Sequence, residues 1–476
     1  MLLIQNGFSC EYEMNIFLSL FFDKEEDVCV MSHFSHKNDE INVYTEIVFE
    51  GKTYFEDYYE FYIKKNERED TKRYRCACTK SFCHAAKKIR EIQLPWGVMS
   101  GIRPAKNVRQ LMDEGFDDSN IQSILSTVYE VTEEKIRLAM TVAKNEHLLL
   151  RELKDKTVSL YIGIPFCPTR CLYCSFVSTD IRTSGKYLND FVLLLLKEIE
   201  KTKEVLKQLE FSVENIYIGG GTPTTLSAEQ ITLICQKLWE CFDFSKLKEF
   251  TLEAGRPDTI TWEKLIAAKK GGVNRISINP QTMHLPTLKK VGRAHTPEMV
   301  KEAFSLARKA GFDNINMDLI AGLPDETAEI FKDSLEQVIA LDPESITVHS
   351  MCVKRAAALR FSKVELTKYQ EMEQMLLYTQ KRMQETGREP YYMYRQKNIS
   401  GNLENVGYAK KGCMSVYNVN IMEEVQTILA LGGGGTSKLV DGDRIERVFN
   451  FKDPYEYIRR FDEILEKKEE VIQFFQ

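Results

Sequence analysis

The sequence lacks a long hydrophobic run, a basic leader and a strong excess of either charge. Near its start, the apolar stretch from Ile16 to Phe22 is too short to cross a bilayer. Lysine and arginine number 64 against 70 acidic residues, a formal net charge of −6. Such a chain has no general attraction to nucleic acid or to anionic membranes. We therefore expect a cytoplasmic protein without nucleic-acid or membrane partners, in which local groups hold any anionic ligand.

The bulk composition excludes a single small module and a wholly disordered chain. A length of 476 residues leaves room for about two to four domains of the usual size. Hydrophobic residues make up 43% and charged residues 28% of the chain, which is ordinary for folded protein with sizeable cores.

Cysteine, in contrast, is abundant, with twelve residues. Thiols stay reduced in the cytosol, so we expect no disulfide framework. Cysteine there serves as buried packing, nucleophile or metal ligand. The spacing of the twelve therefore decides which of them carry chemistry.

The first third of the chain predicts two regions. Residues 1–95 contain alternating runs such as INVYTEIVF and KTYFEDYYEFYI, which indicate a small β-containing domain. Residues 96–156 are predicted to form a helical connector. One helix is expected to begin at Pro104 and to stop at Gly115, and a helical pattern continues from Ser119 to Lys156.

Residues 157–350 alternate short apolar runs with amphipathic stretches. The runs are SLYIGIPF, NIYIGG, KEFTLEA, RISINPQ, NINMDLIAG and SITVHS. Six strands in series with helices between them predict a parallel sheet with helical crossovers, closed or partly closed as a barrel. In such barrels the C-terminal ends of the strands carry the site. The rhythm then breaks, and residues 351–476 are predicted to form a substrate-covering domain.

Three cysteines follow the first predicted barrel strand in the segment YIGIPFCPTRCLYCSF, at a CxxxCxxC spacing: Cys167, Cys171 and Cys174. Three thiolates that leave a fourth position open suit a reactive iron–sulfur cluster. Zinc is the alternative, but structural zinc sites normally use paired CxxC knuckles, and no suitably spaced histidine lies nearby. Buried packing is a weaker alternative still.

This loop resembles that of the radical S-adenosylmethionine (SAM) superfamily. The resemblance implies a [4Fe–4S] cluster on the three cysteines, with the fourth iron chelating the amino and carboxylate groups of SAM. One-electron reduction then yields methionine and a 5′-deoxyadenosyl radical. The implied fold is a partial (β/α)6 barrel of the α/β class, with an N-terminal α+β domain and a C-terminal α+β extension.

Further motifs narrow the resemblance to the oxygen-independent coproporphyrinogen III oxidase family. They are Y-x-x-IPFC, GGGTPT, R-x-S-x-x-x-Q, GR-x-H and MDLI-x-GLP, and they extend from about Leu160 to Ser350. The flanking segments PWGVMSGIRPAK, PYYMYRQKNISGNLENVGYAK and MEEVQTILALGGGGTSK look like the HemZ-type branch, described as coproporphyrinogen dehydrogenase. The likeness then covers most of the chain beyond the first 90 or so residues.

The resemblance also implies residues that bind one or two molecules of SAM. The first molecule, at the cluster, would be held by Tyr161, Tyr173, Gly220 and Glu253. The second would be held by Gly221, Thr222, Gln281, Arg293, Asp318 and the backbone of Cys352.

The same positions have physical interpretations of their own. Glycines at a strand end permit close approach of a ligand, although a tight turn needs them as well. Glu253 and Gln281 are predicted to end the third and fourth strands, at the mouth of the barrel or simply as solvated ends. Asp318 lies within an apolar strand and needs a partner, so a structural salt bridge with Arg293 is the alternative to ligand binding.

Two departures from the oxidase pattern leave the function open. Ser175-Phe176 stands where the oxidases have Gly-Cys, and Gly163 stands where they have His. Ser-Phe is shared with the haem-chaperone branch, but that branch's HN-x-x-YW motif is absent because none of the seven histidines precedes Asn. The alternatives are therefore a haem-binding protein without oxidase activity and another radical SAM reaction on a tetrapyrrole.

The leading hypothesis from the resemblance is oxidative decarboxylation of coproporphyrinogen III to protoporphyrinogen IX. The implied partners are the tetrapyrrole substrate and an electron donor of the flavodoxin or ferredoxin type. Arg395 and Lys397, like Arg103 and Lys106, can meet propionates of the substrate or can be solvated charges.

The remaining cysteines are expected to be structural. Cys76, Cys78 and Cys83, with His84, have no common metal spacing, so partly buried thiols in a surface segment are favoured over a second metal site. The others are predicted to be packing residues: Cys10, Cys29, Cys235, Cys241 and Cys413.

Overall fold

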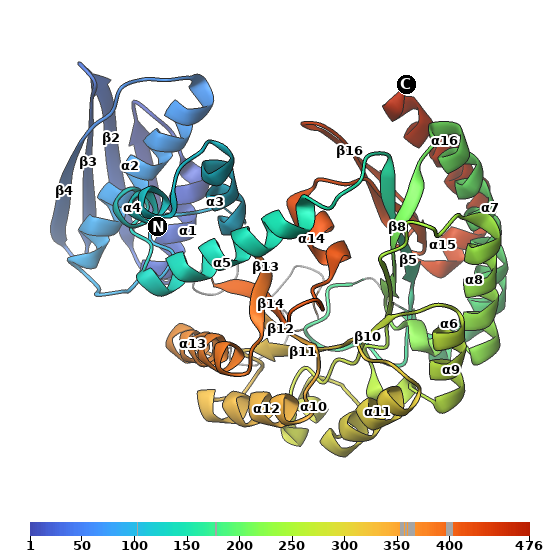
Figure 1. The fold of residues 1–476 in the computed structure, drawn as a ribbon. Helices are drawn as coiled ribbons and strands as arrows, with labels where there is room; N and C mark the ends of the chain where they lie inside the picture. The colour runs from blue at the N-terminus through green and yellow to red at the C-terminus, as the bar shows by residue number, and fades with distance from the viewer. Residues whose placement is uncertain (102, 177–178, 353–356, 358, 360–366, 397–402) are drawn as a thin grey trace. The chain divides into compact units, whose positions relative to one another are not determined.

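The computed structural model describes every residue except 102, 177–178, 353–356, 358, 360–366 and 397–402 (Figure 1). The chain divides into two compact units. Unit 1 comprises Met1–Met140 with Arg395–Leu403, and unit 2 comprises Thr141–Tyr394 with Glu404–Gln476. No helix within the described ranges is long and apolar enough to span a membrane. The predicted boundaries at residues 95, 156 and 350 remain predictions.

Unit 1 is built on a four-stranded sheet in the order β1 to β4. Strand β1 runs parallel to β2, and the later pairs are antiparallel. Helices α1 and α2 pack with the sheet into one core that contains Phe17 and Phe82. The predicted N-terminal α+β domain is thus confirmed. The elements are β1 (Leu2–Asn6), α1 (Glu11–Phe21), β2 (Val28–Lys37), β3 (Glu40–Phe49), β4 (Lys52–Phe61) and α2 (Glu67–Lys87).

The cysteines of α2 belong to this core rather than to a surface segment, which corrects the expectation. Cys76, Cys78 and Cys83 are 7%, 0% and 0% exposed. Burial raises the pKa of the Cys76 thiol to about 12, as expected for an inert buried cysteine. The basic residues that suggested a surface lie mostly on either side of the thiols: Arg75 and Lys87 are exposed, whereas every residue from 76 to 83, including Lys80, is buried.

Of the two helical stretches predicted after residue 96, the first is confirmed as one helix and the second is divided into shorter helices. Helix α3 (Pro104–Asp113) has its proline in the first turn, and Gly115 follows it with a φ of 87°. The predicted helical stretch from Ser119 is broken into α4 (Asp118–Ser123), a π-helical turn and α5 (Glu133–Leu150). Glu130 adopts a left-handed φ of 55° between them, a conformation that cannot continue a right-handed helix.

Unit 2 contains the predicted parallel strands at the centre of an 11-stranded sheet. Six strands pair in parallel with their neighbours: β5, β8, β9, β10, β11 and β12. Residues after 350 supply strands to both edges: β14 pairs antiparallel with β12, and β15 pairs parallel with β5. The strands in sheet order are β13 (Glu389–Arg395), β14 (Glu404–Ala409), β12 (Ser345–Ser350), β11 (Ile315–Ala321), β10 (Arg275–Ser277), β9 (Glu249–Glu253), β8 (Ser212–Gly220), β5 (Thr157–Ile164), β15 (Ile428–Gly432), β16 (Thr436–Asp441) and β17 (Arg444–Phe449).

Helices form an arc along the outer side of this curved sheet (Figure 1). Their apolar faces are buried against the strands, while the loops after the strands are left to carry polar residues. The helices of the arc are α6 (Ile181–Ser184), α7 (Leu188–Leu209), α8 (Ala228–Cys241), α9 (Trp262–Lys270), α10 (Leu285–Lys290), α11 (Pro297–Lys309), α12 (Ala328–Ala340), α13 (Tyr369–Glu385), α15 (Pro454–Arg459) and α16 (Phe461–Phe475), whereas α14 (Val416–Glu423) lies inside the arc (Figure 1).

Candidate functional site

The three predicted cluster cysteines lie on one loop that follows strand β5. The loop begins with the short strand β6 (Phe166–Cys167), which pairs with β7 (Thr179–Asp180). Cys171 is 8% exposed, and Cys167 and Cys174 are half-buried. The amide of Cys174 donates to the carbonyl of Cys171 at 3.1 Å. The loop thus holds three shielded thiols at the C-terminal end of the first barrel strand.

All three sulfurs have a hydrogen-bond donor beside them, which at Cys174 is the Phe176 backbone. The Thr222 hydroxyl lies 3.3 Å from Cys167 Sγ, and Nη1 of Arg256 lies 3.7 Å from Cys171 Sγ. Burial raises the pKa of Cys174 to about 11, and the charges of Cys171 and Cys167 raise it further. Donors of this kind stabilise thiolate ligands and orient them.

The donor set suits an iron–sulfur cluster better than a single zinc ion. Three thiols on one loop are soft ligands of the kind that bind iron in such clusters. In a [4Fe–4S] cluster each thiolate binds a different iron, so three thiols leave one iron without a protein ligand. The three thiols are therefore a suitable donor set for a cluster.

The glycines at the end of β8 pack against the cysteine loop. A Cβ on Gly221 would lie 2.6 Å from the Phe166 carbonyl oxygen, and one on Gly220 would lie 3.0 Å from the Ile164 amide nitrogen. The amides of Gly221 and Thr222 donate to the carbonyls of Ile164 and Phe166 at 2.8 and 2.7 Å. Close packing of β8 on the loop thus requires these glycines. Their contact with a ligand remains a prediction.

Glu253 ends strand β9 as expected, beside a stack of tyrosines. The rings of Tyr161 and Tyr217 stack with their centroids 6.2 Å apart, and the rings of Tyr217 and Tyr417 stack with their centroids 4.8 Å apart. Burial raises the pKa of Glu253 to about 8, and the charge of Asp318 raises it further. A cation beside this carboxyl would restore its ionised form.

Arg293 ties three segments of the site together. Its guanidinium donates to the carbonyls of Gly255 and Asn279 at 2.6 and 2.7 Å and to the Tyr173 hydroxyl at 3.0 Å. The residue is 6% exposed. It therefore connects the cysteine loop, through Tyr173, to the segments that follow β9 and β10.

Gln281 and Asp318 lie together, but not as the sequence predicted. Strand β10 ends at Ser277, and Gln281 lies beyond it with a φ of 67°. The backbone amide of Gln281 donates a hydrogen bond to the backbone carbonyl of Asp318 at 2.9 Å. The partners of the Asp318 carboxylate are Asn316, which donates at 2.7 Å, and His349, at 3.8 Å.

The alternative to ligand binding, a structural salt bridge between Asp318 and Arg293, is not formed, because Asp318 pairs with His349 instead. Burial raises the pKa of Asp318, but His349, Asn316 and the charge of Arg275 together lower it by more, so the net pKa is lowered. His349 lies on β12, one strand away from Asp318 on β11. Apart from the neighbouring order of the two strands, no local sequence pattern predicts this pairing.

Sequence reasoning also missed Arg256 and Asp258, and it included His295 only as the last residue of the GR-x-H motif. Nε and Nη2 of Arg256 donate to the two carboxylate oxygens of Asp258 at 3.0 and 3.1 Å. Nδ1 of His295 lies 3.9 Å from Asp258. Burial lowers the pKa of His295 to about 3, and the Arg293 charge lowers it further, so the ring is neutral. Arg256 follows Glu253 by three residues in EAGRPD, a position after a barrel strand that could have singled it out.

The predicted residues that remain lie outside the segments described above. Cys352 is 9% exposed and follows β12. Lys397 lies outside the described residues. Arg103 and Lys106 are half-buried at the start of α3.

Arg395 is not a solvated charge, because it is only 2% exposed. It donates to the carbonyls of Met99 and Gly101 at 2.7 and 2.9 Å, and its guanidinium lies 5.3 Å from the centre of the Trp96 ring. Binding a propionate would require it to leave these contacts.

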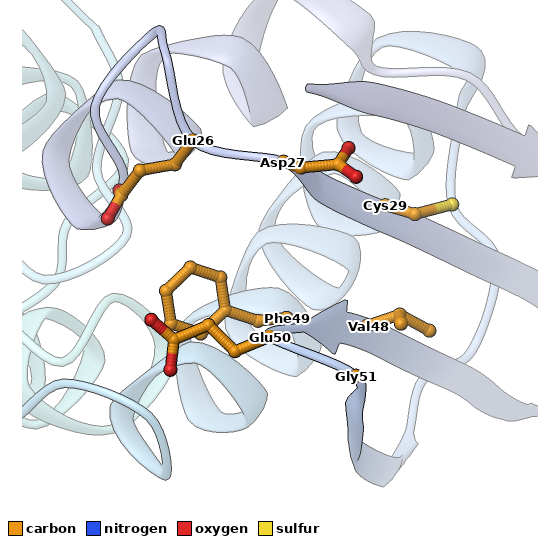
Figure 2. Close-up of a pocket in the computed structure, with 7 residues that line it drawn as sticks. All are labelled: Glu26, Asp27, Cys29, Val48, Phe49, Glu50 and Gly51. Carbon is orange, nitrogen blue, oxygen red and sulfur yellow. The ribbon is translucent and has the colours of Figure 1, made fainter.

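A pocket of about 330 Å³ lies in unit 1, where β2 begins and β3 ends (Figure 2). Carboxylates and apolar side chains line it together, and Arg90 pairs with one of the carboxylates, Glu26. None of the predicted site residues is among its lining residues, so we give it no part in the site. The lining residues are Glu26, Asp27, Cys29, Val48, Phe49, Glu50 and Gly51.

Comparison with known proteins gives consistent matches. Residues 161–338 match the radical SAM superfamily. Over 381 residues the chain is 42% identical to the oxygen-independent coproporphyrinogen-III oxidase-like protein HemZ of Bacillus subtilis, covering 78% of this chain and 76% of HemZ. Over 199 residues it is 38% identical to the heme chaperone HemW of Bacillus subtilis, covering 41% of this chain and 51% of HemW.

The fold is also similar to that of a solved structure, coproporphyrinogen III oxidase (HemN) from Escherichia coli, described as a radical SAM enzyme. The TM-score is 0.54 with 25% identity, covering 67% of this chain and 72% of HemN. Proteins of the superfamily use a [4Fe–4S] cluster and SAM, the cluster that the cysteine loop fits. The chain belongs to the radical SAM superfamily and, within it, to the family of the oxygen-independent coproporphyrinogen-III oxidase-like protein HemZ.

Proposed function

We propose that the protein is a radical SAM enzyme that decarboxylates the propionate side chains of a porphyrinogen. Within this class, the substrate that we propose is coproporphyrinogen III, which the protein would convert to protoporphyrinogen IX in the cytoplasm during haem biosynthesis. One observation carries this proposal: the 42% identity to HemZ extends over 381 residues, far beyond the 178 residues from 161 to 338 that match the superfamily as a whole. The likeness therefore includes regions outside the cluster-binding core.

The residues of the site fall into three groups, according to the cofactor that each would hold. Cys167, Cys171 and Cys174 would hold the cluster. SAM at the cluster would contact Tyr161, Tyr173, Gly220 and Glu253. A second SAM would contact Gly221, Thr222, Gln281, Arg293, Asp318 and Cys352. When bound, the cluster and SAM supply a one-electron reduction that generates a hydrogen-abstracting radical.

The charges of the site support this division. Glu253 is a buried carboxyl with a pKa of about 8, and the cationic groups of SAM would favour its ionised form. The lowered pKa of Asp318 keeps its carboxylate ionised, which suits acceptance of hydrogen bonds from a ligand's hydroxyl or amino groups. Arg293, already bonded to two carbonyls and Tyr173, would act by holding the loop in place.

The proposed reaction balances for each propionate. One hydrogen atom is abstracted from the β-carbon, the bond to the carboxylate breaks to release CO₂, and a vinyl group forms. One electron remains and passes to an external one-electron acceptor. A flavodoxin or ferredoxin type of donor would supply the electron that reduces the cluster.

A second candidate function is haem delivery without oxidase turnover. The 38% identity to the heme chaperone HemW over 199 residues favours it, as does Ser175-Phe176 after the third cysteine. In this function the cluster and SAM sites would be retained, and haem rather than a porphyrinogen would be the tetrapyrrole bound.

An anaerobic assay separates the two candidates. Reconstituted protein with reductant, SAM and coproporphyrinogen III should release 5′-deoxyadenosine and CO₂, and mass spectrometry should show loss of one carboxyl for each vinyl formed. Cys171→Ala should abolish turnover and reduce the iron content. Cys235→Ala is the matched control, because Cys235 is also buried but lies on α8. Haem binding without 5′-deoxyadenosine would contradict the enzyme function, and a product gaining a methyl group would indicate a different radical reaction.

A further inference from the structure

Arg256 lies in the loop after strand β9 and is held rigidly. It is 3% exposed. Its Nε and Nη2 donate to Oδ1 and Oδ2 of Asp258 at 3.0 and 3.1 Å. Two parallel bonds of this kind fix the plane of a guanidinium group and not only its charge.

The remaining nitrogen, Nη1, faces the cysteine loop. It lies 3.1 Å from the Thr169 hydroxyl, 3.4 Å from the Thr169 carbonyl and 3.7 Å from Cys171 Sγ. Cys171 is buried, at 8% exposed. A charged donor is thus directed at a shielded sulfur from a position that Asp258 fixes.

We propose that Arg256 is a positioning residue that fixes the sulfur of Cys171 and sets the reduction potential of the cluster bound there. Hydrogen bonds to cluster sulfurs and nearby charge are the terms by which a protein tunes this potential. A reduced cluster carries one more negative charge than an oxidised one, so a positive donor stabilises the reduced form more. The inference rests on the proposed cluster site but not on the identity of the tetrapyrrole.

Asp258 opposes the charge of Arg256. Burial raises the pKa of Asp258, but the hydrogen bonds and charge of Arg256, with smaller effects from the backbone and His295, together lower it by more, so the net pKa is lowered. The pair is therefore ionised and nearly neutral in sum. Removing Arg256 would leave a carboxylate near the cluster, whereas removing the charge of Asp258 would leave Arg256 uncompensated. The two substitutions should shift the potential in opposite directions.

The test is an anaerobic potentiometric titration of the full-length protein, reconstituted with ferrous iron and sulfide and followed by the electron paramagnetic resonance signal of the reduced cluster. Arg256→Gln should lower the reduction equilibrium constant about tenfold, which for one electron is a shift of about 59 mV to more negative potential. Asp258→Asn should shift the midpoint to more positive potential. Arg382→Gln is the matched control, because Arg382 makes a similar two-pronged pair with Glu336 on α12.

Opposite shifts in the two variants, with the control unchanged, support the proposal. Shifts in the same direction indicate general loosening of the loop and overturn it, as does a midpoint unchanged in both. If Arg256→Gln does not fold, the sign of the shift in Asp258→Asn decides alone, since the amide retains a hydrogen-bond acceptor for Arg256. Wild-type protein that assembles no cluster overturns the cluster site and this inference together. Lack of turnover with coproporphyrinogen III contradicts only the proposed function.

Discussion

At the scale of a single residue, Glu253 shows how burial raises the pKa of a carboxyl group in the site. Its carboxyl lies at the end of β9, where burial and the charge of Asp318 raise its pKa from the usual 4.5 to about 8. In the protein without ligands it is therefore mainly protonated near neutral pH. A cationic ligand would gain a strong partner there on ionising it.

The pKa of Glu253 predicts a pH dependence of stability. Because the folded pKa is raised, the contribution is full below the unfolded pKa of about 4.5 and is lost as the pH rises through about 8. The free energy of unfolding of the ligand-free protein should therefore fall more steeply between about pH 5 and pH 8 in wild type than in Glu253→Gln. Urea unfolding measures this, with the exposed Glu302→Gln on α11 as control. Parallel pH profiles for wild type and Glu253→Gln would contradict it.

The site residues that the sequence identified are those with a local signature. The cysteine spacing and the position of Glu253 at a strand end can be recognised within a few residues. Arg256 has a suggestive position after a barrel strand, but its contact with the Cys171 sulfur joins positions 85 residues apart and cannot be recognised locally. His349 likewise meets Asp318 only because β11 and β12 are neighbours. Contacts of this kind depend on the register of strands, which periodicity does not give.

At the scale of elements, strand β15 explains a departure in the sequence. It pairs with β5, and the turn after it packs on Gly163. The Gly433 amide donates to the Gly163 carbonyl at 2.9 Å, and a Cβ on Gly163 would lie 2.6 Å from the Gly433 carbonyl oxygen. No larger side chain fits at Gly163 without moving β15. The glycine-rich turn and Gly163 are thus parts of one packing arrangement beside the cysteine loop.

Gly163→Ala should destabilise the protein by about 1–3 kcal/mol, the usual cost of overpacking a close contact. The clash is with backbone, so a change of side-chain rotamer cannot relieve it. Gly185→Ala is the control, since Gly185 has a helical φ of −59° and the nearest atom to its Cβ would be 3.6 Å away. Both are measured by urea unfolding. Equal effects of the two substitutions would show that the turn adapts.

A buried carboxylate holds the helices α7, α15 and α16 to β15. Glu198 accepts from Tyr457 and Asn450 at 2.7 and 2.8 Å and from the Gly432 amide at 2.8 Å, and Lys468 lies 2.8 Å from it. Glu198→Leu leaves every one of these donors without the carboxylate, so we expect a loss of about 3–5 kcal/mol in the free energy of unfolding.

Lys468→Met should cost less than Glu198→Leu, because Glu198 keeps its three neutral donors. Equilibrium unfolding of both variants measures the difference. A larger loss for Lys468→Met would show that the ion pair, and not the set of hydrogen bonds, dominates.

On the scale of the whole molecule, the sequence predicted the centre of unit 2 and not its edges. Six parallel strands follow from alternating apolar and amphipathic runs. The pairing of β15 with β5 places Ile428 beside Ser159, and no local pattern encodes a contact over that separation. The sequence predicts no strand at Ile428–Gly432, because five residues of strand are too few to show a period.

The division into two compact units predicts that each can lose its structure separately. Phe82 is fully buried in the core of unit 1, and Phe250 is fully buried in β9 of unit 2. Each Phe→Ala change should cost about 3–5 kcal/mol in its own unit. Hydrogen exchange in increasing urea, followed by mass spectrometry, reports on peptides from β3 and β9 separately. Phe82→Ala should accelerate exchange in β3 and leave β9 nearly unchanged, and Phe250→Ala should do the reverse. If either substitution accelerates both peptides equally, the units unfold as one cooperative body, and cluster binding in unit 2 would then also depend on the core of unit 1.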